Sequence, residues 1–276
     1  MAEQIHPIDC LVNRYPQLAM PIEKNFSHSE EYKNVCLKGL PTERQPHFIK
    51  TDKDRLDTFV TPAGSVDVLF LDNREDFVHA YLALGNKCEP MEIPDSMGSC
   101  ILFGLNNWEK IHGILLPLNT IDKSCYKDEL IILSGGAYSN VSAKNLGLDE
   151  DDWINKSIKI RTFHELTHFV SRKLYIENKS AIRDEIMADM IGIIYAYGKY
   201  DTELARRFLG IENGVYCQGG RLENYEYMGY SIEDKITIAN QLIDAMSKEL
   251  QKIDASDLFK VIMHMEENLC SRLPTG

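Results

Sequence analysis

The sequence predicts an α+β protein, because its strand-like segments come first and its helical segments follow. Dense apolar runs typical of strands occur between residues 66 and 134. From about residue 156 onward, apolar side chains recur with the helical period instead. Strands followed by helices favour an α+β arrangement over alternating units. We therefore expect a mixed β-sheet upstream and a mostly helical C-terminal half.

The first 60 residues are polar and irregular. Prolines that would interrupt any long helix recur along this segment, at Pro7, Pro16, Pro21, Pro41 and Pro46. We expect an extended arm or a loop-rich cap here.

The central region carries the expected strands, at residues 66–71, 100–105 and 129–134, with 113–118 as a further possible strand. Asp72 or Asn73 can cap a helix that runs to about Leu84. The helices expected in the second half cover about residues 156–176, 183–199, 202–209, 233–252 and 256–271.

Composition excludes several classes of function. The 30 Lys and Arg against 42 Asp and Glu give a formal charge of −12, which does not suit nucleic acid or an anionic membrane as a partner. The longest apolar run, residues 186–197, is broken by Asp189 and is too short to span a bilayer. The seven cysteines form no CxxC pair, and no secretory signal begins the chain, so we expect a reducing, cytoplasmic location. No oligomeric state follows from the sequence.

The most informative segment is His164-Glu165-Leu166-Thr167-His168. Residues four apart share one face of a helix, so His164 and His168 can direct two imidazole nitrogens at one metal ion. Glu165 lies beside that face, where its carboxylate can reach a water on the metal. The pattern predicts a zinc site with a general base.

A catalytic zinc usually takes three protein ligands. The next expected helix offers Glu185 and Asp189, again four residues apart. Glu185 can be the third ligand, while Asp189 can accept the outer N–H of a ligating histidine and fix its tautomer. The alternative is that the two carboxylates form a solvated acidic stripe.

Residues 163–192 resemble the active-site and glutamate-ligand helices of the thermolysin family of gluzincin metallopeptidases. The resemblance implies a zincin-like fold, in which a mixed sheet packs on the active-site helix, and a Zn²⁺ cofactor. His164, His168 and Glu185 match the zinc ligands, Glu165 the general base and Asp189 the histidine-orienting aspartate. The family's downstream transition-state histidine segment and its acidic calcium loops have no counterpart.

The expected function is a zinc-dependent hydrolase, a protease of the metallopeptidase type, that cleaves a peptide or amide bond with a zinc-activated water and Glu165 as the base. The oxyanion needs a further donor, and we expect Tyr225 and Arg221 in that role. Other side chains of suitable chemistry are Tyr175, Tyr227, Tyr230 and His264. Two alternatives stay open, a non-catalytic interaction protein braced by zinc and a metal-dependent amidohydrolase with a non-peptide substrate.

Three regions are expected on this basis: an N-terminal arm or cap at 1–60, a catalytic core at 61–200 and a helical region completing the cleft at 201–276. In zincins, an edge strand beside the active-site helix often pairs with an extended peptide. The strand at 129–134 is either such an edge strand or an ordinary core strand.

Overall fold

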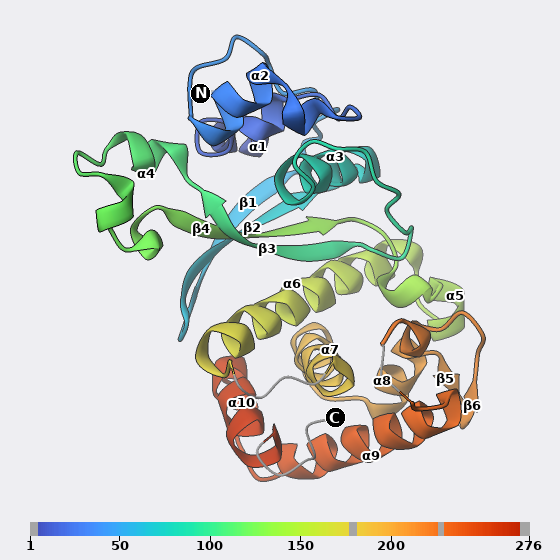
Figure 1. Ribbon diagram of the computed structural model, residues 1–276. Coiled ribbons are helices and arrows are strands. Elements are labelled where there is room, and N and C mark those ends of the chain that lie inside the picture. Colours follow the sequence, from blue (N-terminus) through green and yellow to red (C-terminus); the bar gives the residue numbers. More distant parts are fainter. Residues whose placement is uncertain (1–4, 177–180, 226–228, 271–276) are drawn as a thin grey trace. The chain divides into compact units, whose positions relative to one another are not determined.

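The computed structural model describes residues 5–176, 181–225 and 229–270 (Figure 1). The chain forms two compact units, one comprising residues 1–60 and 65–135 and the other residues 61–64 and 136–276. The first unit holds a four-stranded mixed sheet and the second is mostly helical, which confirms the α+β prediction.

The sheet has the order β1-β2-β4-β3. Strand β4 pairs in parallel with β2 and antiparallel with β3. The strand bounds are Arg55–Thr61 for β1, Gly64–Leu71 for β2, Ser99–Asn106 for β3 and Lys127–Ser134 for β4. The three main expected strands are confirmed. The possible strand at 113–118 is wrong, because this segment is a loop in which Leu115 is 97% exposed.

Strand β4 lies inside the sheet, between β2 and β3. Its residues Leu130, Ile131 and Ile132 are completely buried. Both of its hydrogen-bonding edges are therefore occupied, so β4 is a core strand and cannot pair with an extended peptide. The edge-strand alternative for residues 129–134 is wrong.

The N-terminal segment is part of the core of the first unit and not an arm. Ile8, Leu11 and Tyr15 are buried in one apolar cluster with Leu69 and Phe77. Its prolines begin short helices, since Pro7 starts helix α1 and Pro16 starts a 3₁₀ turn.

The helices of this unit are α1 (Pro7–Leu11), α2 (Glu30–Tyr32), α3 (Arg74–Gly85) and α4 (Trp108–His112). Asn73 caps α3 by accepting from the N–H groups of Glu75 and Asp76.

Helix α7 is the centre of the second unit, and α6, α8, α9 and α10 surround it (Figure 1). The bounds are α5 (Ala143–Leu146), α6 (Glu150–Leu174), α7 (Ala181–Tyr197), α8 (Thr202–Phe208), α9 (Ile232–Leu250) and α10 (Leu258–Met265), with a small hairpin of β5 (Ile211–Glu212) and β6 (Val215–Tyr216). All five expected helices are present. Helix α6 begins earlier than expected because Asp149 caps it.

The two units divide the chain differently from the expected regions at 1–60, 61–200 and 201–276. Residues before 60 share a core with the sheet, whereas α6 and α7 share contacts with α9 and α10 from the C-terminal part. Among the described helices, none combines the length and the apolar character that crossing a membrane requires.

Candidate metal centre

Helices α6 and α7 bring the predicted ligands together. On α6, His164 and His168 lie one turn apart, and both are buried. Glu185 lies in the first part of α7. The stacked rings of Phe163 and Tyr195, with centroids 3.8 Å apart, join α6 and α7. The two histidines of α6 and the glutamate of α7 therefore meet where these helices pack together.

The three donors form a small triangle. The Nε2 atoms of His164 and His168 are 3.1 Å apart. Glu185 places Oε2 3.4 Å from the first nitrogen and Oε1 3.2 Å from the second. Ligands at about 2.0–2.1 Å in a tetrahedral zinc site are separated by about 3.3 Å. The spacings are therefore close to those around a zinc ion, with each of the two Glu185 carboxylate oxygens facing one imidazole nitrogen.

The chemistry of the group also fits a metal ion. His164, His168 and Glu185 are the three described residues whose donor atoms converge closely enough to bind a cation. Two imidazoles and one carboxylate suit zinc among the common divalent metals. The Glu185 side chain is 25% exposed against 8% for each histidine, so the group is reached by solvent from the glutamate side.

Asp189 lies one turn after Glu185 and is buried in α7. Its Oδ1 is 3.0 Å from Nδ1 of His164, on the far side of that ring from the metal-binding nitrogen. This is the contact that the sequence predicts for a histidine-orienting aspartate. The acidic-stripe alternative does not hold for Asp189, because this side chain faces the protein interior.

Arg221 and Tyr225 both lie beside Glu185. We call the candidate ligands His164, His168 and Glu185 the metal group. Arg221, at the start of the 3₁₀ turn η7 (Arg221–Asn224), places Nη2 2.6 Å from Oδ2 of Asp189. Its Nε donates to the hydroxyl of Tyr225 at 2.6 Å. That hydroxyl in turn donates to Oε2 of Glu185 at 3.1 Å. The side chains named as oxyanion donors thus surround the carboxylates of α7, and their catalytic role stays a prediction.

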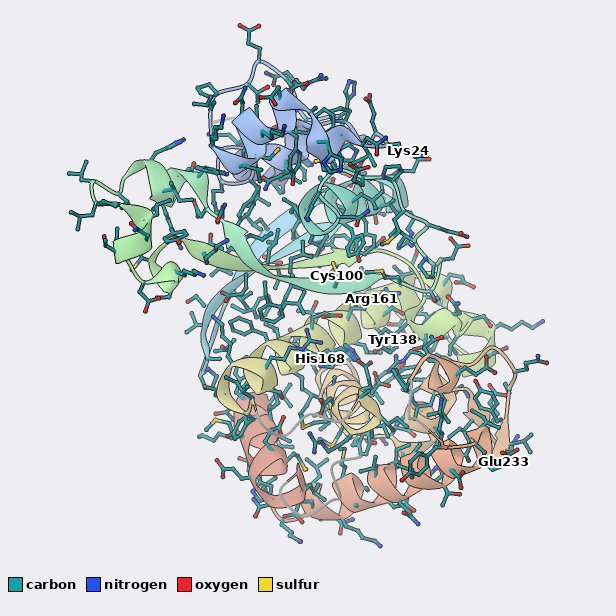
Figure 2. All side chains as sticks on the ribbon, in the orientation of Figure 1. Lys24, Cys100, Tyr138, Arg161, His168 and Glu233 are labelled. Carbon is teal, nitrogen blue, oxygen red and sulfur yellow. The ribbon has the colours of Figure 1, made fainter. Side chains whose placement is uncertain are left out.

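Tyr138 completes the site and was not predicted from the sequence. It begins the short turn η6 (Tyr138–Asn140), and its hydroxyl donates to Oδ1 of Asp189 at 2.6 Å. The same oxygen is 2.9 Å from Nδ1 of His164. Figure 2 labels Tyr138 and His168 where α6 lies against α7. No local pattern marks this tyrosine, because it follows a strand in an irregular segment.

The candidate base, Glu165, lies on α6 between the two histidines and is 6% exposed. A carboxylate at this depth costs free energy unless other groups compensate its charge. Its role as the general base stays a prediction.

Residues 1–271 match the model of a family of unknown function, DUF7005. The chain belongs to DUF7005. No curated protein and no solved structure matches it.

Charged neighbours shift the pKa values of several side chains in the site of the DUF7005 protein. Burial favours the neutral form of His164, but hydrogen bonds and charges of Asp189 and Glu185 outweigh this and raise its pKa to about 10. Burial acts against the ionised carboxylates, yet contacts with the two histidines hold the pKa of Glu185 well below its usual range. The charge of Arg221 is the main factor that outweighs burial and lowers the pKa of Asp189.

The remaining donor candidates of the DUF7005 protein have other partners. Tyr175 donates to Glu267 at 3.2 Å, and His264 lies 2.9 Å from the carboxylate of Glu249 on α9. Tyr230 is 47% exposed. Tyr227 lies outside the described residues. Tyr225 and Arg221 are the candidates that the structure brings to the metal group.

Proposed function

We propose that this DUF7005 protein is a zinc-dependent hydrolase, of the metallopeptidase type, that cleaves a peptide or amide bond. The observation that carries the proposal is the convergence of His164, His168 and Glu185. The two Nε2 atoms are 3.1 Å apart, and each lies 3.4 or 3.2 Å from a different oxygen of the Glu185 carboxylate. Glu165 lies on the same helix between the two histidines. This combination supplies ligands and a base from two neighbouring helices.

Each residue of the site has its own role in the proposed reaction. His164, His168 and Glu185 hold the ion, which supplies a Lewis acid for the carbonyl oxygen and lowers the pKa of a water to about 7. Glu165 takes the proton of the attacking water and passes it to the leaving amine. Tyr225 is placed next to a ligand carboxylate, where its hydroxyl can donate to the developing oxyanion. Arg221 is held by Asp189, so we assign it the role of fixing that carboxylate.

The geometry supports a catalytic site over a zinc brace. Structural zinc sites are usually closed by four protein ligands, whereas catalytic sites keep one position open. Among the residues that the structure describes, three side chains converge on the candidate site. A non-peptide amide would use the same residues, so a substrate screen must distinguish the two classes of hydrolase.

The decisive experiment combines metal analysis with an activity screen. We expect the purified full chain to contain about one zinc per chain and to cleave members of a peptide and amide library in a chelator-sensitive manner. Glu165→Gln should retain the metal and lose activity by about 10²-fold or more. His164→Ala should lose the metal.

A matched control is His264→Ala, because His264 is paired with Glu249 outside the metal group. This variant should keep full zinc content. Retained activity in Glu165→Gln would refute the base, and full zinc content in His164→Ala would refute the ligand. Failure of the wild-type chain to bind any divalent metal would refute the proposed function.

A further inference from the structure

The Tyr138 hydroxyl lies at the junction of three charged or polar groups. Arg221 can only donate, and its Nη1 is 3.0 Å from the hydroxyl oxygen. Asp189 is ion-paired with the same guanidinium at 2.6 Å and accepts. Of the two acceptors that remain, Oδ1 of Asp189 at 2.6 Å is closer than Nδ1 of His164 at 2.9 Å and carries negative charge. The hydroxyl hydrogen therefore points to Asp189, while the oxygen accepts from Arg221.

This arrangement determines which ring nitrogen of His164 carries the hydrogen. Its Nδ1 faces two oxygens, Oδ1 of Asp189 at 3.0 Å and the hydroxyl of Tyr138 at 2.9 Å. The Tyr138 hydrogen is already directed at Asp189, so both oxygens present lone pairs to Nδ1. The Nδ1 atom therefore carries a hydrogen. In the neutral ring that would bind a metal, the lone pair then resides on Nε2, the atom that faces His168 and Glu185.

Helix α6 holds Tyr138 in this position. Ser157 accepts the backbone N–H of Tyr138 at 3.0 Å. Arg161 donates to the carbonyl oxygens of Gly136 and Ala137, each at 2.7 Å. The guanidinium carbons of Arg161 and Arg221 lie 5.7 and 5.4 Å from the centre of the Tyr138 ring.

The residues that hold the Tyr138 segment, Ser157 and Arg161, lie in one row along α6 with the two histidines. Ser157, Arg161, His164 and His168 follow each other at intervals of four, three and four residues, and all are buried. Such intervals place side chains on the same face of a helix. One face of α6 therefore supplies both two metal ligands and the groups that fix Tyr138.

We propose that Tyr138 is a positioning residue for the metal centre, whose hydroxyl fixes the His164 ring and the Asp189 carboxylate so that Nε2 of His164 is directed at the ion. The inference rests on the metal site of the proposed function and is independent of the hydrolytic step. Loss of groups that orient metal-binding histidines typically weakens metal binding by about 10- to 100-fold.

The test compares two tyrosine variants. Tyr138→Phe keeps the ring and removes the hydroxyl. The matched control is Tyr15→Phe, because Tyr15 is equally buried and donates to Asp128 at 3.0 Å in the other unit. Zinc dissociation constants are measured by competition with a chromogenic chelator, and the thermal midpoint of each variant is recorded.

We expect the zinc dissociation constant to rise about tenfold or more in Tyr138→Phe and to stay unchanged in Tyr15→Phe. Long-range ¹H–¹⁵N spectra of the zinc-loaded chain should show a hydrogen on Nδ1 of His164 that exchanges faster with solvent in Tyr138→Phe. A purely structural role would lower the thermal midpoint without changing this exchange.

A second variant tests the same inference if Tyr138→Phe does not fold. Ser157→Ala removes the anchor of the Tyr138 backbone and leaves the phenol in place, and a several-fold weaker affinity for zinc is expected. Unchanged affinity and exchange in whichever of these variants folds would overturn the role of Tyr138. A wild-type chain that binds no zinc would overturn the proposed function together with this inference.

Discussion

Gly192 of α7 lies directly against the backbone of Ile160 of α6. A Cβ atom at position 192 would come within 2.7 Å of the carbonyl oxygen of Ile160 and within 2.9 Å of its Cγ2. Contacts this short are not tolerated by real side chains, so the two ligand-bearing helices approach each other because residue 192 is a glycine.

Gly192→Ala should force α6 and α7 apart. We expect the free energy of unfolding to fall by about 1–3 kcal/mol, as for other overpacked interiors, and zinc to bind more weakly because its ligands come from both helices. Urea denaturation and zinc titration measure the two effects. Gly113→Ala is the control, since a Cβ there would come no closer than 3.4 Å to a neighbouring atom. Unchanged stability and affinity in Gly192→Ala would contradict the close helix contact.

Removal of the metal should destabilise the protein. A ligand that binds only the folded state stabilises it by about 2.7 kcal/mol when its free concentration is about 100 times the dissociation constant. We therefore expect the thermal midpoint to fall on treatment with a chelator and to recover when zinc is added. His168→Ala should show the low midpoint with or without zinc. A midpoint that chelation does not change in the wild-type chain would contradict this prediction.

Arg221 should be essential to the stability of the second unit, because it neutralises the buried carboxylate of Asp189 at 2.6 Å. Breaking a buried ion pair by removing one partner costs about 3–5 kcal/mol. We expect Arg221→Met to lose stability on this scale in chemical denaturation, and the double variant with Asp189→Asn to recover part of it.

The control for this prediction is Arg44→Met. Arg44 pairs with Glu31, and the two side chains are 47% and 37% exposed. Exposed pairs of this kind contribute about 0–1 kcal/mol. Equal losses in the Arg44 and Arg221 variants would show that Asp189 does not depend on Arg221 for its charge.

Asp54 should make the stability of the first unit dependent on pH. It is buried and accepts the N–H groups of Thr51 and Asp72 at 2.9 and 2.8 Å. Burial raises the pKa of this carboxyl, but the hydrogen bonds from Thr51 and Asp72 outweigh burial and lower it. A carboxyl whose pKa is lowered by folding stabilises the fold above its unfolded pKa of about 3.9 and loses this contribution as the pH falls through the folded pKa.

We therefore expect Asp54→Asn to be about 1–3 kcal/mol less stable than the wild type at pH 7, and the difference to shrink in acid below about pH 4. Urea denaturation at several pH values measures this. Asp52→Asn, at an exposed neighbouring position, should match the wild type throughout. A difference that stays constant with pH would refute the role of the Asp54 charge.

The convergence of the candidate ligands could be predicted from the sequence because local geometry determines their arrangement. His164 and His168 share a face of α6, and Glu185 and Asp189 share a face of α7, whatever the rest of the chain does. A single close helix pair then brings both faces together. Helical periodicity also located the main elements of the second half.

Tyr138 and the bonds of Arg221 could not be predicted in the same way. Each lies at the start of a short irregular turn, and the partner that both share, Asp189, is more than 30 residues away along the chain. The burial of the N-terminal segment could not be predicted for a related reason. Its prolines do limit this segment to short helices, as expected, but Pro7 and Pro16 also begin helical turns whose apolar residues join the core of the sheet.

The polar row of α6 links the folding of the second unit to its chemistry. An interior helix face normally consists of apolar side chains at these intervals, but here it carries Ser157, Arg161, His164 and His168. Changing only one of these residues would leave the polar side chains that it contacts buried without a partner. In relatives that lack the proposed metal site, we therefore expect aliphatic residues in place of the whole row, and a change of Tyr138 with it.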